Sequence, residues 1–483
     1  MTQNILYYGD NLDVLRRHVK DESIDLVYLD PPFKSNQDYN VLFAEQNGSK
    51  SKAQIKAFED TWRWDQEAAE TYEEIVEAGG RVSQVMQAFE KFLGQSDMLA
   101  YLSMMAPRLI ELQRVLKSTG SIYLHCDPTA SHYLKMLMDA IFGKQVFQNE
   151  IVWCYKTGGA TKRRFARKHD ILLFYTKSET DYLFNPQKEK SYMMHTYGFK
   201  KSDFQTDESG QYAWVIAKDW WEIPSVGSAD KQRLGYPTQK PEKLLEKIIM
   251  ASSNEGDIVL DPFCGCGTTI AVAQRLNRHW IGIDITHLAI TLIKHRLHDA
   301  FGATISYQVI GEPVSLPDAK TLAKEDPYQF QWWALGLVGA RPVEQKKGSD
   351  KGIDGRLYFH DDPVSGKTKQ IIISVKAGHT GSPHIRDLRG VIEREKAEIG
   401  VLISMEEPTK HMRTEAAGAG FYDSPWGKRF PHLQILTVGE LLEGKGIEYP
   451  PPSQVNVTFK KAPKTREDED KGQGNLPLKK KQG

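Results

Sequence analysis

Cysteine is scarce in this chain: only Cys126, Cys154, Cys264 and Cys266 are found among 483 residues. Their number and irregular spacing exclude a disulfide framework and a zinc ribbon, and they indicate a reducing compartment. Long apolar runs are also missing, since none approaches the roughly 20 residues that a membrane-spanning helix needs. The first residues lack the basic region and apolar stretch of a secretion signal. We therefore expect a soluble, cytoplasmic protein that has no membrane partner.

The chain also lacks net charge, because 63 Lys and Arg residues balance 63 Asp and Glu residues. Any attraction to nucleic acid must therefore come from local basic patches. Disorder is excluded by composition, since 40% hydrophobic residues, 20 Tyr, 19 Phe and 10 Trp are ordinary for a folded protein. At about 150 residues per domain, the length predicts two or three domains.

Short apolar runs alternate with helical patterns through the first 300 residues, which is typical of a parallel α/β sheet. Helices are predicted over Asp97–Leu116 and, after a glycine-rich turn, over Thr268–Leu276. The fold class is therefore α/β, with a doubly wound, Rossmann-like sheet in a domain spanning residues 1–315. The predicted strands are Ile5–Tyr8, Ile24–Leu29, Ser121–Cys126, Ile171–Tyr175, Ile258–Leu260 and Trp280–Ile285.

The regular pattern stops between about residues 155 and 235, where basic and aromatic residues are separated by turns. We interpret this segment as an insertion rather than sheet, with Trp220 and Trp221 in its core. Residues 316–326 have the composition of a linker. A second, smaller α/β domain is predicted over 327–449, and the charged end, 450–483, is typical of a solvated tail.

The first motif that carries chemistry, Asp30-Pro31-Pro32-Phe33, directly follows a predicted strand. In open α/β sheets, ligands bind at the carboxyl ends of strands. The prolines stiffen the turn and remove N–H groups, which leaves the Pro31 carbonyl as an acceptor. Asp30 adds a carboxylate and Phe33 an aromatic face. The motif suits a planar amine, and a plain strand-ending turn is the alternative.

The second motif, residues 261–269 with the sequence DPFCGCGTT, also follows a strand and opens a helix. Its glycines allow close approach of a ligand to the backbone. However, Ile270 stands where a dinucleotide fingerprint has its third glycine, and no P-loop lysine follows Gly267. Asp284 ends the next strand, where a carboxylate can accept hydrogen bonds from ribose hydroxyls. The pattern favours a nucleoside without phosphates, and Cys264 and Cys266 are interpreted as small packing residues.

Together these motifs resemble the amino-group DNA methyltransferases that use S-adenosylmethionine, in the permuted, or beta-class, arrangement in which the catalytic motif precedes the cofactor motif. The resemblance covers about residues 1–310. It also includes 236–241, which resembles the segment that closes over the methionine moiety. The resemblance implies that Asp30, Pro31, Pro32 and Phe33 are catalytic. The implied cofactor-binding residues are Asp10, Lys240, Asp261, Phe263, Gly265, Gly267 and Asp284.

The permuted arrangement makes a topological prediction. The strands ending at Leu260 and Asp284 would be the first two of the sheet, and those ending at Tyr8, Leu29 and Cys126 the third, fourth and fifth. Asp10 would then lie near the adenine of the cofactor. Capping of the helix that follows Asp10 is an alternative, and the two roles are compatible.

The implied reaction is methyl transfer to the exocyclic N6 amine of adenine in double-stranded DNA. Adenine is favoured because the motif begins with Asp, whereas cytosine-N4 members of the family often begin with Ser. The alternatives are a cytosine-N4 methyltransferase, an RNA amine methyltransferase and a DNA-binding module with vestigial sites. The segment 155–235 would supply base contacts, and the six basic residues between Lys156 and Lys168 would contact phosphates.

In the C-terminal domain, Asp354 and Lys376 resemble the metal-binding Asp and the catalytic Lys of the Mrr-like branch of the PD-(D/E)xK nucleases, which implies Mg²⁺. Ser374 departs from that pattern, because it offers only a hydroxyl where the family has an acidic or amide ligand. Two interpretations follow: a fused restriction and modification enzyme that cleaves DNA, or an inactive domain that grips it.

Overall fold

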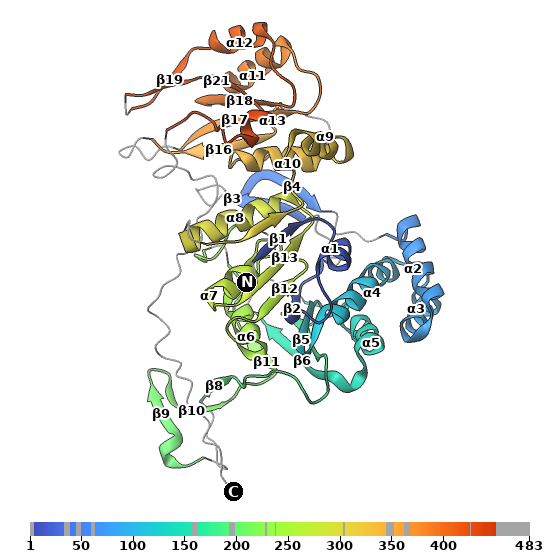
Figure 1. Cartoon of the computed structure of the whole chain (residues 1–483). Helices are drawn as coiled ribbons and strands as arrows, with labels where there is room; N and C mark the ends of the chain where they lie inside the picture. The colour runs from blue at the N-terminus through green and yellow to red at the C-terminus, as the bar shows by residue number, and fades with distance from the viewer. Residues whose placement is uncertain are drawn as a thin grey trace.

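The computed structural model describes residues 4–32, 39–44, 50–58, 63–155, 162–192, 199–227, 229–236, 238–302, 305–343, 352–361, 368–425 and 427–450. Every helix within these ranges is too short or too polar to cross a membrane. Figure 1 shows a central α/β body, a second α/β unit above it and a small sheet projecting below. The predicted tail lies outside the described residues from 451 onward.

A sheet of nine described strands forms the centre of the body, in the order β11-β6-β7-β5-β2-β12-β13-β1-β14. The stretch from β5 to β14 is parallel, whereas β7 runs antiparallel to both β5 and β6. The strands are β1 Ile5–Tyr8, β2 Ile24–Leu29, β5 Leu116–Cys126, β6 Phe147–Cys154, β7 His169–Thr176, β11 Trp220–Glu222, β12 Ile258–Asp261, β13 His279–Asp284 and β14 Gln308–Ile310.

The strands predicted as first to fifth are β12, β13, β1, β2 and β5. They are neighbours in this sheet, in the spatial order β1-β13-β12-β2-β5. The start of the chain separates the second of them, β13, from the third, β1. Because all five are parallel, their carboxyl ends meet at one edge of the sheet. Asp10, Asp30, Asp261 and Asp284 lie at or just beyond these strand ends, so the topology brings the two motifs to the same edge.

Helices cover both faces of the sheet, because side chains alternate along each strand. On β2, Val27 and Leu29 pack with α1, α4 and α5, whereas Leu26 and Tyr28 pack with α6, α7 and α8. The prediction of a doubly wound α/β fold is confirmed. The helices are α1 Asn11–His18, α2 Gln66–Ala78, α3 Gly80–Leu93, α4 Asp97–Val115, α5 Ser131–Phe142, α6 Glu242–Ser252, α7 Thr268–Arg275 and α8 His287–Phe301.

The segment 155–235 is only partly an insertion. The strand predicted over Ile171–Tyr175 is confirmed as β7, although it runs antiparallel to its neighbours, and the expectation that the rest of the segment lies outside the sheet is wrong for β11. Apolar β7 side chains such as Leu172 and Phe174 are buried in the core of the body, which explains why this strand belongs to the central sheet. Between them, β8 Lys188–Ser191, β9 Phe204–Asp207 and β10 Gly210–Ile216 form a separate antiparallel sheet that projects from the body (Figure 1).

The two tryptophans of this segment behave differently. Trp221 is buried, as predicted, and its indole N–H donates to the Lys218 carbonyl at 2.7 Å. Trp220 is 46% exposed, so its assignment to a core is wrong. Its ring lies against the Lys218 ammonium, with Nζ 3.9 Å from the ring centroid. Successive residues of a strand face opposite sides, and here only one side is covered.

The predicted linker, 316–326, is instead almost entirely a helix, α9 Leu316–Glu325. Ser315 caps it, with Oγ accepting from the Asp318 N–H at 3.3 Å, and Pro317 lies in the first turn, where proline is tolerated. Ala319 is fully buried in the core of the C-terminal unit. A single buried small residue is a weak hydrophobic signal, which is why the polar composition suggested a linker.

The C-terminal unit is built on a five-stranded sheet in the order β15-β16-β17-β18-β21, of which the last three strands are parallel. Helices α9, α10 and α13 pack on one face, and α11 and α12 on the other. Its remaining elements are β15 Arg341–Pro342, β16 Gly355–Phe359, β17 Lys369–Lys376, β18 Ile399–Ser404, β21 Leu433–Thr437, α10 Pro327–Leu337, α11 Ser382–Glu395, α12 Lys410–Ala417, α13 Val438–Leu442, and the hairpin β19 Phe421–Asp423 and β20 Arg429–Pro431.

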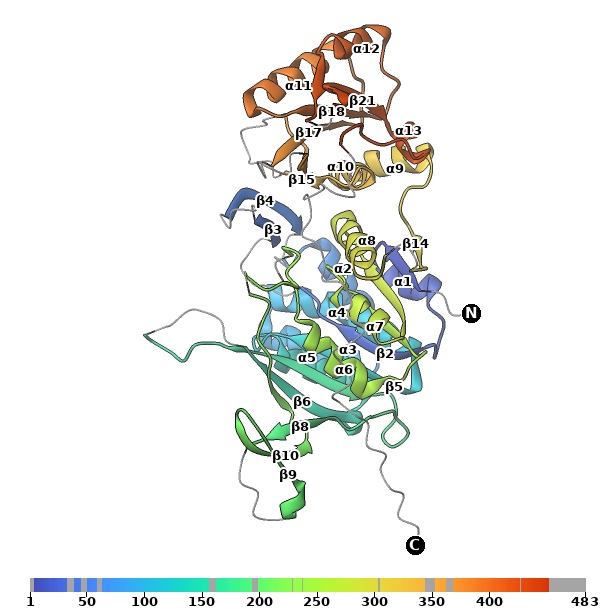
Figure 2. The same ribbon diagram turned by 90° about the vertical axis from the view of Figure 1, so that its left-hand side faces the viewer.

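The two units meet where α10 lies against α8, and Figure 2 shows the second unit stacked on this side of the body. The His287 N–H donates to Gln329 Oε1 at 3.2 Å. A Cβ at Gly336 would lie 2.6 Å from Thr291 Oγ1, so the helices approach closely there. A further hairpin, β3 Tyr39–Ala44 and β4 Lys50–Phe58, follows the first motif.

Candidate active site

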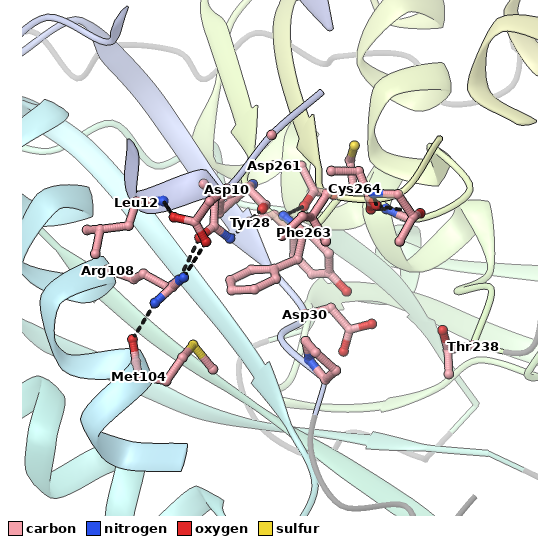
Figure 3. A pocket seen from close by; sticks show the side chains of 18 of the residues that line it. Asp10, Leu12, Tyr28, Asp30, Met104, Arg108, Thr238, Asp261, Phe263 and Cys264 are labelled. Carbon is pink, nitrogen blue, oxygen red and sulfur yellow. Dashed lines mark hydrogen bonds and ion pairs between the residues drawn. The ribbon is translucent and has the colours of Figure 1, made fainter. Parts of the chain in front are cut away.

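A cavity of about 550 Å³ opens at the sheet edge where β1, β2, β12 and β13 end. Figure 3 shows side chains from both motifs pointing into it. Pro31 is buried, neither Pro31 nor Gly267 is among the lining residues of the cavity, and Phe33 lies outside the described residues. The predicted site residues that line the cavity are Asp10, Asp30, Pro32, Lys240, Asp261, Phe263, Gly265 and Asp284.

Asp30 forms an ion pair with Lys240, with Oδ2 and Nζ 2.5 Å apart. Asp30 follows β2, whereas Lys240 lies in the turn before α6, so the contact joins the first motif to the segment 236–241. The two side chains are only 25% and 16% exposed, which shields the pair from water. The sequence predicted that both residues lie in the site, but it did not predict that they touch.

The turn after β12 depends on glycine at two positions. Gly265 and Gly267 have φ values of +50° and +72°, in the left-handed region that favours glycine. A Cβ at Gly267 would lie 2.7 Å from Ile293 Cγ1, and one at Gly265 would lie 3.2 Å from the Tyr236 ring. Cys264 and Cys266 are buried in this turn, as predicted for packing residues, and burial raises the pKa of both thiols.

Two further carboxylates give the cavity an acidic wall. Burial raises the pKa of Asp261 to about 7, and the charges of Asp30 and Asp284 act in the same direction. Burial also raises the pKa of Asp284 to about 6, although hydrogen bonds from Thr286 and Gly265 oppose this. A cation bound in the cavity would relieve the repulsion among these groups. The two carboxylates therefore favour a ligand that carries positive charge.

Asp284 is held in place by several hydrogen bonds. Its Oδ2 accepts from the Gly265 N–H at 2.9 Å, and its Oδ1 accepts from the N–H and hydroxyl of Thr286 at 2.9 and 2.8 Å. These bonds orient Asp284 at the edge of the cavity, and the Ile285 N–H also contributes a hydrogen bond to it.

Asp10 caps helix α1, which confirms the alternative role predicted for it. Its Oδ1 accepts from the Leu12 and Asp13 N–H groups at 2.9 and 3.2 Å. Its Oδ2 pairs with Arg108 Nη2 at 2.6 Å, a contact drawn in Figure 3. Asp10 also lines the cavity, and its cofactor-binding role stays a prediction.

Arg108 was not identified from the sequence, because it lies within the ordinary amphipathic pattern of α4. Its Nε donates to Asn11 Oδ1 at 2.6 Å, and Asn11 Nδ2 donates to the Pro262 carbonyl at 2.8 Å. Together with its pairing to Asp10, these bonds connect α4, α1 and the turn after β12. Arg108 therefore positions two walls of the cavity relative to each other.

Arg296 ties the same turn to the opposite helical layer, and it was also missed. It is 2% exposed on α8, and its Nη1 donates to Thr268 Oγ1 and the Cys266 carbonyl at 3.1 and 3.3 Å. Its Nη2 pairs with Glu242 Oε1 at 2.8 Å, and Glu242 pairs in turn with Arg275. A buried network of this kind is costly to break at one member.

A second buried network lies on the other side of Asp30. The Tyr28 hydroxyl and His125 Nδ1 are 2.9 Å apart, and His125 Nε2 lies 3.2 Å from Asp170 Oδ2. Burial alone would raise the pKa of Asp170, but the hydrogen bond to His125 and the charge of Lys240 hold it below its ordinary value. The network connects β2, β5 and β7 directly behind the cavity.

In the C-terminal unit the predicted pair does meet, with Lys376 Nζ 3.7 Å from Asp354 Oδ2. The same oxygen accepts from the Val375 N–H at 2.7 Å and the Ser374 hydroxyl at 3.1 Å. In the part of the chain that the structure describes, no three His, Cys, Asp or Glu side chains gather as a metal site. This donor set does not support the expected Mg²⁺.

The family described as DNA methylase matches residues 24–295, and that described as NACHT-associated inactive Restriction Endonuclease 1 matches 329–443. Type II methyltransferase M.HpaI of Haemophilus parainfluenzae is 30% identical over 291 residues, which cover 59% of this chain and 71% of M.HpaI. DNA adenine methyltransferase YhdJ of Escherichia coli (strain K12) is 26% identical over 296 residues, covering 60% and 82%.

Among solved structures, the M1.HpyAVI–SAM complex is 18% identical, with a TM-score of 0.36, and the match covers 61% of this chain and 98% of that one. The methylase match spans more than half of the chain and includes both motifs that line the cavity. The chain therefore belongs to the family of DNA methylases that act on adenine N6 or cytosine N4.

Proposed function

We propose that this chain transfers a methyl group from S-adenosylmethionine to the N6 amine of adenine in double-stranded DNA. The observation that carries the proposal is a single cavity lined both by Asp30, after β2, and by the glycine-rich turn after β12. Such a transfer needs an amine acceptor beside a nucleoside pocket, because the reacting groups must be held in contact.

The residues of the cavity suit this cofactor. S-adenosylmethionine supplies an electrophilic methyl group on a positively charged sulfur. In the proposal, Asp284 accepts the ribose hydroxyls, and Gly265 lets the backbone approach the ligand. The Asp261 and Asp284 carboxylates favour the positive charge, whereas Asp30 is already paired with Lys240.

Asp30 and Pro31 act on the target base. An exocyclic amine is a poor nucleophile because its lone pair is delocalised into the ring. The Asp30 carboxylate accepts one amine N–H and the Pro31 carbonyl accepts the other, which favours a pyramidal nitrogen. Because Asp30 Oδ2 is paired with the Lys240 ammonium, Asp30 Oδ1 is the oxygen proposed to receive the amine proton.

Four features support the finer assignment. The motif begins with Asp rather than Ser, and the similar protein YhdJ is named a DNA adenine methyltransferase. The catalytic motif precedes the cofactor motif in the chain, which is the order of the permuted, beta class. A basic loop, residues 162–168, leaves the same sheet edge and suits the phosphates of a duplex.

Nucleoside analysis tests the proposal directly. Purified protein would be incubated with tritiated S-adenosylmethionine and duplex plasmid DNA, and the DNA then digested to nucleosides. The expected labelled product is N6-methyldeoxyadenosine. Labelled N4-methyldeoxycytidine would refute the choice of base, and transfer to RNA but not to DNA would refute the choice of nucleic acid.

Cofactor binding is expected to strengthen as the pH rises. Asp284 and Asp261 have pKa values of about 6 and 7, so both are protonated at pH 5 and ionised at pH 8. Only the ionised forms attract a cation, and the affinity should therefore increase by about tenfold over this range. Titration calorimetry would measure it, with Asp284→Asn expected to flatten the dependence. An affinity that falls with rising pH would contradict the assignment.

For the C-terminal unit, we propose an Mrr-like nuclease fold that no longer cleaves. Asp354 is the single carboxylate of the predicted nuclease pair, Asp354 and Lys376. It accepts a hydrogen bond from the Ser374 hydroxyl and forms an ion pair with Lys376. One carboxylate leaves a divalent cation short of ligand charge. The matched family is itself described as an inactive restriction endonuclease.

We expect no nicking or cutting when the protein is incubated with millimolar Mg²⁺ and unmethylated supercoiled plasmid DNA. Gel electrophoresis of the plasmid would reveal either product. The variant Asp354→Asn serves as the control: cleavage by the wild-type chain that this variant loses would show that the site is active.

A further inference from the structure

Phe165 is the most exposed large hydrophobic side chain among the described residues, with an exposed fraction of 98%. Val314 and Phe92 follow, at 79% and 75%. Single exposed apolar residues are common on protein surfaces, so exposure by itself assigns no role. The surroundings of Phe165 distinguish it from the other two.

Phe165 stands in the middle of a strongly basic loop. Residues 162–167 are all exposed, and no acidic residue occurs between 162 and 168. Such a concentration of cations attracts the phosphates of nucleic acid and would bring the aromatic ring against the duplex. The cations on the two sides of the ring are Lys162, Arg163, Arg164, Arg167 and Lys168.

The loop leaves the sheet at the edge that carries the cavity. It ends where β7 begins, and Ile171 of β7 pairs with Cys126, the last residue of β5. β5 is parallel to β2, whose carboxyl end carries Asp30. In Figure 2 the described part of the loop extends away from the body. Phe165 is therefore presented to a ligand that approaches the cavity from outside.

We infer that Phe165 is a wedge that enters the DNA base stack at the position vacated by the target base. The inference rests on the proposed function, because an amine inside a duplex can reach Asp30 only if its base is extruded. Extrusion loses pairing and stacking, and an inserted ring restores part of the stacking. The ring also leaves water on insertion, so its apolar surface contributes only in the complex.

Three variants and two substrates test the wedge. The variants are Phe165→Ala, Phe165→Trp and, as a matched control, Phe92→Ala, which removes an exposed ring from helix α3. One substrate is an unmethylated duplex oligonucleotide that contains the sequence that the protein methylates in plasmid DNA. The other is the same duplex with the base opposite the target removed, so that the target base is already unpaired. Methyl transfer from tritiated S-adenosylmethionine is measured for each combination.

On the intact duplex, Phe165→Ala is expected to slow transfer by about tenfold or more, because extrusion loses its stacking partner. Phe165→Trp and Phe92→Ala should remain close to wild type. On the duplex with the unpaired target, Phe165→Ala should recover to within about threefold of wild type, because less interaction must be broken.

Wild-type activity of Phe165→Ala on the intact duplex would overturn the wedge, and so would an equal loss on both substrates, which would indicate a simple contact. Both results leave the proposed function intact. Failure of the wild-type protein to methylate any DNA would instead refute the proposed function, and the wedge with it.

Discussion

Replacing Asp30 with Asn is expected to reduce methyl transfer by at least about a hundredfold, because the amine loses its charged acceptor and the base that takes its proton. The affinity for S-adenosylmethionine should change little, since the Gly265 turn and Asp284 are untouched. Asn is preferred to Ala because it keeps the shape of the side chain beside Lys240, which is only 16% exposed. A transfer assay and titration calorimetry would measure the two quantities.

Asp25→Asn provides a matched control for this variant. Asp25 lies on the same strand, β2, near its opposite end, where it accepts from Lys117 Nζ and the Ile258 N–H at 2.8 and 2.9 Å. Its loss should affect stability and leave transfer by the folded protein unchanged. Full activity of Asp30→Asn would refute the role proposed for Asp30.

Replacing Arg296 with Met is expected to lower the free energy of unfolding by about 3–5 kcal/mol, because Glu242 then loses a buried partner. The substitution also removes the hydrogen bonds that hold Thr268 and the Cys266 carbonyl. Cofactor affinity should therefore fall as well, although Arg296 does not line the cavity. Urea unfolding followed by circular dichroism would measure the loss of stability.

The double variant Glu242→Gln with Arg296→Met completes the test. Its loss should be smaller than the sum of the two single losses, because the double variant leaves no unpaired buried charge at these positions. Additive losses, or a loss below about 1 kcal/mol for Arg296→Met, would show that the network contributes little.

The motifs could be found in the sequence because each requires unusual residues in one contiguous segment. Two prolines after Asp30 and two glycines near Asp261 leave a visible pattern. Their meeting at one sheet edge could also be predicted, since the carboxyl ends of parallel strands share an edge. Phe33 lies outside the described residues, so its predicted stacking role stays a prediction.

Other expectations were wrong where the local sequence was compatible both with a loop and with a regular helix or strand. The segment around β11 has the basic and aromatic composition of a loop, yet it pairs with β6 and extends the sheet. Residues 316–325 have the composition of a linker, yet Ala319 anchors them as a helix. In both cases a few tertiary contacts outweighed weak local preferences.

By itself, the sequence determined where the core strands β1, β2, β12 and β13 lie in the chain and which residues form the two motifs, because these follow from periodicity and from residues adjacent in the chain. The numbering of the strands followed from the resemblance to the methylase family, and their spatial order came from the structure. Only the tertiary structure decided that Lys240 pairs with Asp30, Arg108 with Asp10 and Arg296 with Glu242. Each pair joins residues far apart in the chain, and a lysine or arginine looks the same in the sequence whether its side chain faces water or a buried carboxylate. The packing of helices on the sheet makes that choice.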